Sequence, residues 1–109
     1  MALALNVFQS VTSVVGTSPS VVYTAPVGYT GVVLLAQVAN IGSTSENVTF
    51  IHRRGVVDTE IMSSFPISFN DTLNLLYGKL VLESGDKLVI YGSNATNLKF
   101  IASILETLN

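Results

Sequence analysis

Short runs of β-branched and apolar residues dominate this sequence, and they limit the folds that the chain can adopt. Gly, Asn, Ser or Thr interrupts these runs about every eight to twelve residues, a spacing typical of β-sandwiches and barrels. Branched side chains pack well on a pleated sheet and lose rotamer freedom in a helix. The pattern therefore predicts an all-β protein.

Nine candidate strands can be placed, each end to within about two to four residues. They lie near 3–13, 20–25, 31–39, 47–53, 56–63, 65–69, 73–82, 86–92 and 97–106. Eight or nine short strands predict an antiparallel β-sandwich or a jelly-roll-like fold. A chain of 109 residues suits one domain, 1–109, in which residues 1–13 form either an N-terminal arm or an edge strand.

Two turns stand out. Ser84-Gly85-Asp86 separates the apolar runs 79–83 and 87–91, which predicts a strand–turn–strand hairpin. Pro26 holds the residue before it in an extended conformation, and Gly28 can adopt a positive φ. The segment 25–28 is therefore expected to be a corner.

Two strands are apolar on both alternating faces. The run from Gly31 to Asn40 has almost no polar alternation, and in the last strand Ile101 and Leu105 lie on the face opposite Leu98 and Phe100. Charged residues make up only 11% of the chain, against about 25% in typical domains. We therefore expect these faces either to be central to the core or to be covered by a neighbouring subunit. We also expect the isolated protein to self-associate or to be poorly soluble.

Charge and composition argue against several partners. A net charge of −2 with five Lys and Arg gives no basic stripe for nucleic acid. No run of about 20 apolar residues exists, so a membrane span is not expected. The first residues carry no Lys or Arg ahead of the apolar ones, so we expect mature sequence and not a signal peptide. Without cysteine, disulfides and thiolate sites are excluded.

The titratable residues do not suggest an active site. His52 is the one histidine, and the carboxylates are scattered without the spacing of a calcium-binding loop. Asp58 and Glu60 lie two apart, as two acids on one wet face of a strand. We expect no enzyme activity, no cofactor, no metal and no small-molecule substrate.

Two groups of residues are candidates for protein–protein contacts. His52, Arg53 and Arg54 precede Gly55 at an expected strand end, and the guanidinium groups could pair with acidic groups of a neighbouring subunit or could lie in a solvated turn. In the N-terminal stretch, the apolar residues at odd positions would form one face of an arm or edge strand. These are Leu3, Leu5, Val7 and Val11.

A family resemblance is carried by Tyr23–Thr30 and the run to Asn40, together with Gly78–Asp86 and Ser103–Asn109. These segments resemble small virion structural proteins of tailed phages, including phages that infect cyanobacteria. The resemblance implies a component present in many copies, on the capsid or in the neck, tail, baseplate or fibre base. It implies no catalytic residues.

We therefore expect a non-enzymatic virion protein. The first hypothesis is a capsid decoration, or cement, protein that binds the major capsid protein or other virion proteins as a trimer or ring, located in the virion and assembled in the host cytoplasm. The alternative is a neck, tail, baseplate or fibre-base module. A weaker alternative is a carbohydrate-binding module with tyrosine rings as the stacking platform. Its candidates are Tyr23, Tyr29, Tyr77 and Tyr91.

Overall fold

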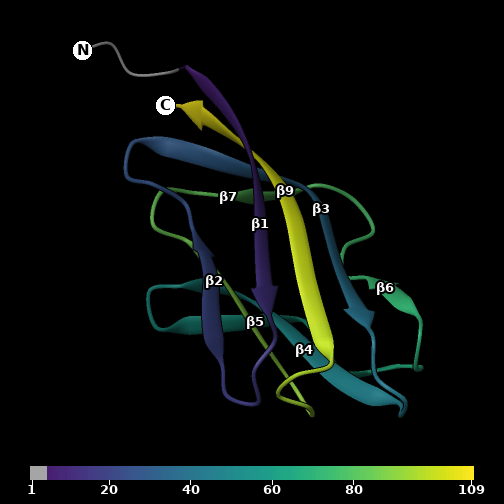
Figure 1. The fold of residues 1–109 in the computed structure, drawn as a ribbon. Helices are drawn as coiled ribbons and strands as arrows, with labels where there is room; N and C mark the ends of the chain where they lie inside the picture. The colour runs from purple at the N-terminus through teal and green to yellow at the C-terminus, as the bar shows by residue number, and fades with distance from the viewer. Residues whose placement is uncertain (1–4) are drawn as a thin grey trace.

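A computed structural model describes residues 5–109, and within that range the chain forms nine strands and their connections (Figure 1). None of the described residues forms a helix long and apolar enough to span a membrane. The strands are β1 (Asn6–Val14), β2 (Ser20–Thr24), β3 (Tyr29–Asn40), β4 (Glu46–Arg54), β5 (Val57–Ile67), β6 (Thr72–Asn74), β7 (Leu80–Leu82), β8 (Lys87–Gly92) and β9 (Leu98–Leu108).

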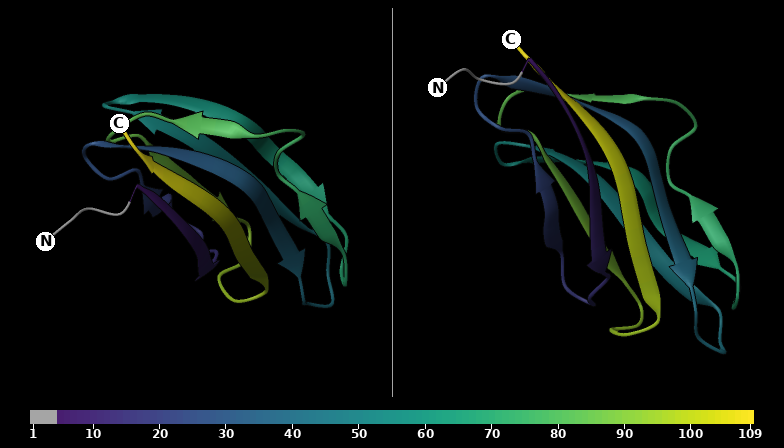
Figure 2. Two further views of the ribbon diagram at one scale, coloured as in Figure 1. Left: turned by 90° about the horizontal axis from the view of Figure 1, so that it is seen from above. Right: turned by 45° about the horizontal axis from the view of Figure 1, so that its top comes forward.

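The strands form two antiparallel sheets packed face to face. The first sheet, called sheet A, has the order β1-β9-β3-β6, and β7 also pairs with β3. The second, sheet B, has the order β2-β8-β4-β5. Figure 2 shows β1, β9 and β3 side by side in one layer, with the strands of sheet B behind them. This strand order is that of a jelly roll, in which β6 and β7 share the place of one edge strand. The predicted all-β sandwich is confirmed.

The core lies between the sheets and follows the period of two that strands impose. On β9, the alternate residues Leu98, Phe100, Ala102 and Ile104 are buried, as the sequence predicts. Phe100 meets Phe50 of β4 across the core, with ring centroids 5.8 Å apart, within the range of favourable aromatic pairs. Such pairs, one side chain from each sheet, hold the sandwich together.

The connection at Ser84–Asp86 differs from the prediction. Gly85 does adopt a positive φ of 86° and the chain does turn, but β7 pairs with β3 in sheet A and β8 pairs with β2 and β4 in sheet B. The predicted hairpin is therefore wrong, and the turn is a crossing between the sheets. The backbone of this turn pairs with the residue that follows β2: Gly85 N–H donates to Ala25 C=O, and Ala25 N–H donates to Asp86 C=O.

Two further strand predictions need correction. Residues 56–63 and 65–69 were expected to be separate, but one strand, β5, passes through Ser64, which adopts a φ of 46° beside register shifts against β4. Conversely, 73–82 is two strands, since β7 pairs with residues 31–33 of β3 and β6 pairs with residues 37–39. Between these two segments, β3 shifts register against β9. The predicted corner at Gly28 is confirmed, with a φ of 85°.

Candidate interaction surface

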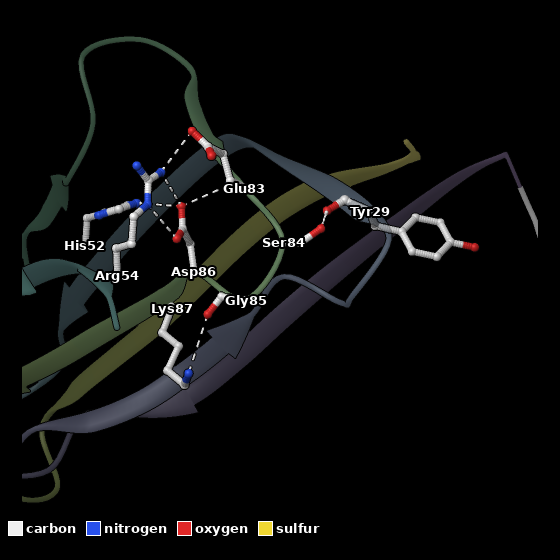
Figure 3. A network of polar contacts seen from close by, with 8 residues as sticks. All are labelled: Tyr29, His52, Arg54, Glu83, Ser84, Gly85, Asp86 and Lys87. Carbon is white, nitrogen blue, oxygen red and sulfur yellow. Dashed lines mark hydrogen bonds and ion pairs between the residues drawn. The ribbon is translucent and has the colours of Figure 1, made fainter. Parts of the chain in front are cut away.

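A buried carboxylate organises the end of the sandwich where β4 meets the β7–β8 connection (Figure 3). Arg54 Nε donates to Asp86 Oδ1 at 2.9 Å and Arg54 Nη2 donates to Oδ2 at 2.7 Å, a bidentate pair. His52 Nε2 lies 3.1 Å from the same Oδ2, and Glu83 N–H donates to it at 2.9 Å. We call Asp86 and these three partners the Asp86 cluster.

The Asp86 cluster stabilises the fold by joining β4 to the β7–β8 connection. His52 and Arg54 continue the inward-facing alternation of Val48 and Phe50, so β4 carries them to where the apolar core ends. The side chain of Asp86 is only 3% exposed. The Arg54 guanidinium, the Glu83 amide and His52 hold the pKa of Asp86 well below its usual range, although burial alone would raise it. Asp86 therefore stays ionised. Its contacts join β4 of sheet B to the connection that leaves β7 of sheet A.

Arg53 points to the opposite face of β4 and pairs within the same hairpin. Its Nε and Nη2 donate to Asp58 at 2.6 and 3.0 Å. Both arginines thus contact carboxylates of their own chain. Pairing of their guanidinium groups with acidic groups of a neighbouring subunit stays a prediction. The prediction of a strand end entering a turn is confirmed, since β4 ends at Arg54 and Gly55 has a φ of 61°.

A second buried polar pair joins the two sheets. The Tyr23 hydroxyl of β2 donates to Glu106 of β9, and both residues are buried. Burial, with the adjacent Glu106 carboxylate, raises the pKa of Tyr23 well above its usual range. Gly31 makes room for the ring, because a Cβ there would lie 3.3 Å from the Tyr23 hydroxyl oxygen. Tyr23 is therefore not available as an exposed stacking ring.

The N-terminal candidates divide between two environments. β1 is an edge strand of sheet A, and its odd-numbered residues Val7 and Val11 are half-buried, with Val11 packed against the core. Leu5 is 70% exposed ahead of the strand, and Leu3 lies outside the described residues. Val7 and Val11 therefore share one face of an edge strand, as predicted, but this face points toward the core, and the outward face of β1 is the even-numbered one.

The outward face of sheet A carries an apolar row across four strands. β1, β9, β3 and β7 place four residues directly opposite one another in register, and directly opposite residues share a face. Phe8 is 74% exposed and Val81 is 55% exposed, while the two between them are half-buried. This apolar row is Phe8, Leu105, Val32 and Val81.

The rest of this outward face mixes polar with apolar side chains and is almost uncharged. Leu34, Leu35 and Ile101 add partly exposed apolar area, and Lys99 is the one charged residue among the outward-facing strand residues that the structure describes in sheet A. Beside the apolar row, the small residues Ser10 and Ser103 leave a hollow of about 230 Å³ between Phe8 and Leu34. A larger hollow of about 610 Å³ lies toward the other end of the same strands, at Thr12, Gln37, Ala39, Thr72, Lys99 and Ile101.

Other classes of site find little support in residues 5–109. No group of three or more His, Asp or Glu among them could hold a metal ion. The four tyrosines do not form one platform, because Tyr29 begins β3 in sheet A, Tyr91 lies on β8 in sheet B, and Tyr77 lies in the β6–β7 connection.

The outward face of sheet A was only partly visible in the sequence. The two-faced apolar character of 31–40 and of the last strand indicated that one face would need cover, and that face is the one just described. The contribution of Phe8 and Val81 was missed, because it depends on which strands are neighbours. A further signal was present in the sequence: no Asp, Glu, Lys or Arg precedes Glu46.

Comparison with known proteins identifies a fold and no family. No protein-family model matches the chain, and no curated protein sequence matches it. Among solved structures, a match is a chain of the structure described as "Bacillus endospore appendages form a novel family of disulfide-linked pili", with a TM-score of 0.57 and 13% sequence identity over 100% of this chain and 97% of that one. This chain is similar in fold to that appendage protein.

Proposed function

We propose that this protein is a non-enzymatic structural subunit of a multi-copy assembly, and that the assembly is a phage particle. The observation that carries the proposal is the apolar row on the outward face of sheet A. Contiguous apolar surface on a soluble protein marks a site for a protein neighbour, and side chains such as Phe8 and Val81 gain from being covered.

The distribution of charge supports the same proposal. The ion pairs of Arg53 and Arg54 are made within the chain and serve the fold. Among the described strand residues on the outward face of sheet A, Lys99 is the one that carries a charge. Depletion of charge is a property of interface cores. The similar fold described as part of Bacillus pili also serves in a repeated assembly, although this chain has no cysteine with which to make disulfide links.

Within the particle, capsid decoration is the role we propose first, with a neck, tail, baseplate or fibre-base position second. In either role, sheet A would lie against the major capsid protein or another virion protein. The resemblance of Tyr23–Asn40 and Gly78–Asp86 to tailed-phage virion proteins supports the phage particle. A capsid surface offers hundreds of equivalent positions, whereas a neck or tail offers far fewer.

The test is the copy number of this chain per purified particle, measured by quantitative mass spectrometry against the major capsid protein. Hundreds of copies support decoration, and six to a few dozen support the neck or tail. Absence from particles made by cells that express the protein would refute the phage proposal.

A variant links this measurement to the surface. Val81→Lys places a charge in the apolar row, and incorporation should fall by about tenfold or more, as expected for a charge desolvated in an interface. Val56→Lys is the matched control, because Val56 is 99% exposed at the β4–β5 turn of sheet B. An equal fall in incorporation for Val81→Lys and Val56→Lys would show that the outward face of sheet A is not the contact surface.

A further inference from the structure

The edges of the two sheets differ in how well they could accept another strand. β5 carries Asp58, Glu60 and Pro66 and shifts register against β4. β2 has five residues with a register shift, and β6 and β7 have three residues each. Charges, proline, irregularity and short length are the features by which proteins protect sheet edges from pairing. Three of the four edges are thus protected.

β1 has none of these protections. It has nine residues without a charge, proline or glycine, and it pairs with β9 in unbroken register from Asn6↔Thr107 to Val14↔Lys99. Within residues 5–109, β9 is the strand that pairs with it, so its other side is an unpaired edge. A long, regular, uncharged edge is a template for pairing with another strand.

The direction of the free backbone groups follows from the contacts at the two ends of β1. Val15 N–H donates to Leu98 C=O, and Leu108 N–H donates to Leu5 C=O. Because hydrogen-bonded and non-hydrogen-bonded pairs alternate in an antiparallel ladder, odd-numbered residues of β1 bond to β9. The N–H and C=O groups of the even-numbered residues therefore point to the free edge. These residues are Asn6, Phe8, Ser10, Thr12 and Val14.

We propose that β1 pairs with β1 of a second copy of this chain, antiparallel about a two-fold axis at Ser10. In this register Ser10 lies opposite Ser10 of the second copy, Phe8 opposite Thr12, and Asn6 opposite Val14. Every even-numbered residue of each strand then makes a hydrogen-bonded pair, and shifting the register leaves some of them unpaired. The two A sheets become one continuous sheet.

The side chains favour this register. Phe8 of one copy lies diagonal to Val14 of the other on the outward face, close enough for an aromatic ring to contact it. Phe8 is 74% exposed and Val14 is 50% exposed in the single chain, so the pairing covers both. No charged residue of β1 is desolvated, because β1 has none. A second copy is the partner that fits, since the matching edge is also uncharged and of equal length.

Disulfide trapping tests the axis and the register, and the chain has no cysteine to interfere. At the axis, Ser10→Cys places two Cα atoms about 5.5 Å apart, within the range of about 4.4–6.8 Å that a disulfide needs. In the same dimer the two Cα atoms of Asn6→Cys are about 27 Å apart. Under mild oxidation we expect covalent dimers from Ser10→Cys, few from Asn6→Cys, and dimers from Asn6→Cys mixed with Val14→Cys.

Light scattering on the wild type and two variants separates edge pairing from packing of the outward faces. The wild type should approach twice the mass of one chain as concentration rises from about 1 µM to about 1 mM. Ser10→Pro removes an N–H that points to the free edge and should leave a folded monomer, checked by thermal unfolding. Val81→Lys, on the opposite edge, should still dimerise.

Several outcomes would overturn the pairing. They are a monomeric wild type at the highest concentration, growth into species larger than a dimer, equal trapping of Ser10→Cys and Asn6→Cys, or loss of the dimer in Val81→Lys alone. The pairing concerns the isolated chain, so absence from phage particles would refute the proposed function and leave these results unchanged.

Discussion

The Asp86 cluster and the outward face of sheet A use opposite strategies. At the Asp86 cluster, a buried carboxylate is surrounded by four donor contacts from β4 and the β7–β8 connection. On the outward face of sheet A, apolar side chains such as Phe8 and Val81 remain exposed, with almost no charge among them. Polar contacts thus close the fold at one end, and apolar surface stays exposed on sheet A, where we propose that a neighbour covers it. Substitutions in the first region should change stability, and those in the second should change association.

The largest expected effect on stability is that of Asp86→Ala. It removes the charge-assisted hydrogen bonds that join β4 to the β7–β8 connection, at a cost of about 2–3 kcal/mol in the free energy of unfolding. Asp58→Ala is the matched control, since it removes another bidentate arginine pair whose carboxylate is 34% exposed. Denaturant unfolding should show a much smaller change in the free energy of unfolding for Asp58→Ala. Equal changes in the two variants would mean that the Asp86 cluster does not stabilise the fold more than an exposed ion pair does.

Acid should weaken the same region. The pKa of Asp86 is lowered in the folded protein, so the unfolded chain binds the proton first as pH falls below about 4. The contribution of Asp86 is therefore present above about pH 4 and is lost as pH falls further. The difference in unfolding free energy between wild type and Asp86→Asn should shrink between about pH 4 and pH 2. A difference that stays constant over this range would contradict the assignment.

Tyr23→Phe should have a smaller effect, about 1–2 kcal/mol, because it leaves buried Glu106 without its hydroxyl donor. The raised pKa of Tyr23 gives this contribution an alkaline limit. It is present below about pH 10, where the unfolded chain also keeps the proton, and is lost as pH rises toward the folded value. Thermal unfolding at about pH 7 and pH 10.5 should show the gap between wild type and Tyr23→Phe narrowing.

The smallest effect on stability is expected for Val81→Lys, within about 0.5 kcal/mol, because the side chain is already 55% exposed. Chemical denaturation of the purified variant measures it. A loss as large as that of Asp86→Ala would show that the outward face of sheet A supports the fold and is not free for a neighbour.

Features set by neighbouring residues in the chain were predictable. The buried alternation from Leu98 to Ile104 follows from the period of two along a strand, and the positive φ of Gly28 follows from its place after Pro26. Both needed only local sequence. The all-β class was predictable for the same reason, since it depends on the sum of many such local preferences.

Features set by strand pairing were not predictable in this way. Gly85 shows that the chain reverses, but a reversal within one sheet and a crossing between sheets have the same local sequence. Arg54 and Asp86 are far apart in the sequence, so their pairing required the fold. Ser64 looked like a strand break, because the register shifts that accommodate its positive φ depend on β4.

The pairing of β1 with β9 also sets an order for folding during synthesis. β1 leaves the ribosome long before its partner strand, Leu98–Leu108, is made. At about 5–20 residues per second, the gap is on the order of 5 to 20 s. Throughout that time an uncharged strand has neither edge satisfied within its own chain. Nascent chains on neighbouring ribosomes of one message would then present β1 to one another before any of them can complete sheet A.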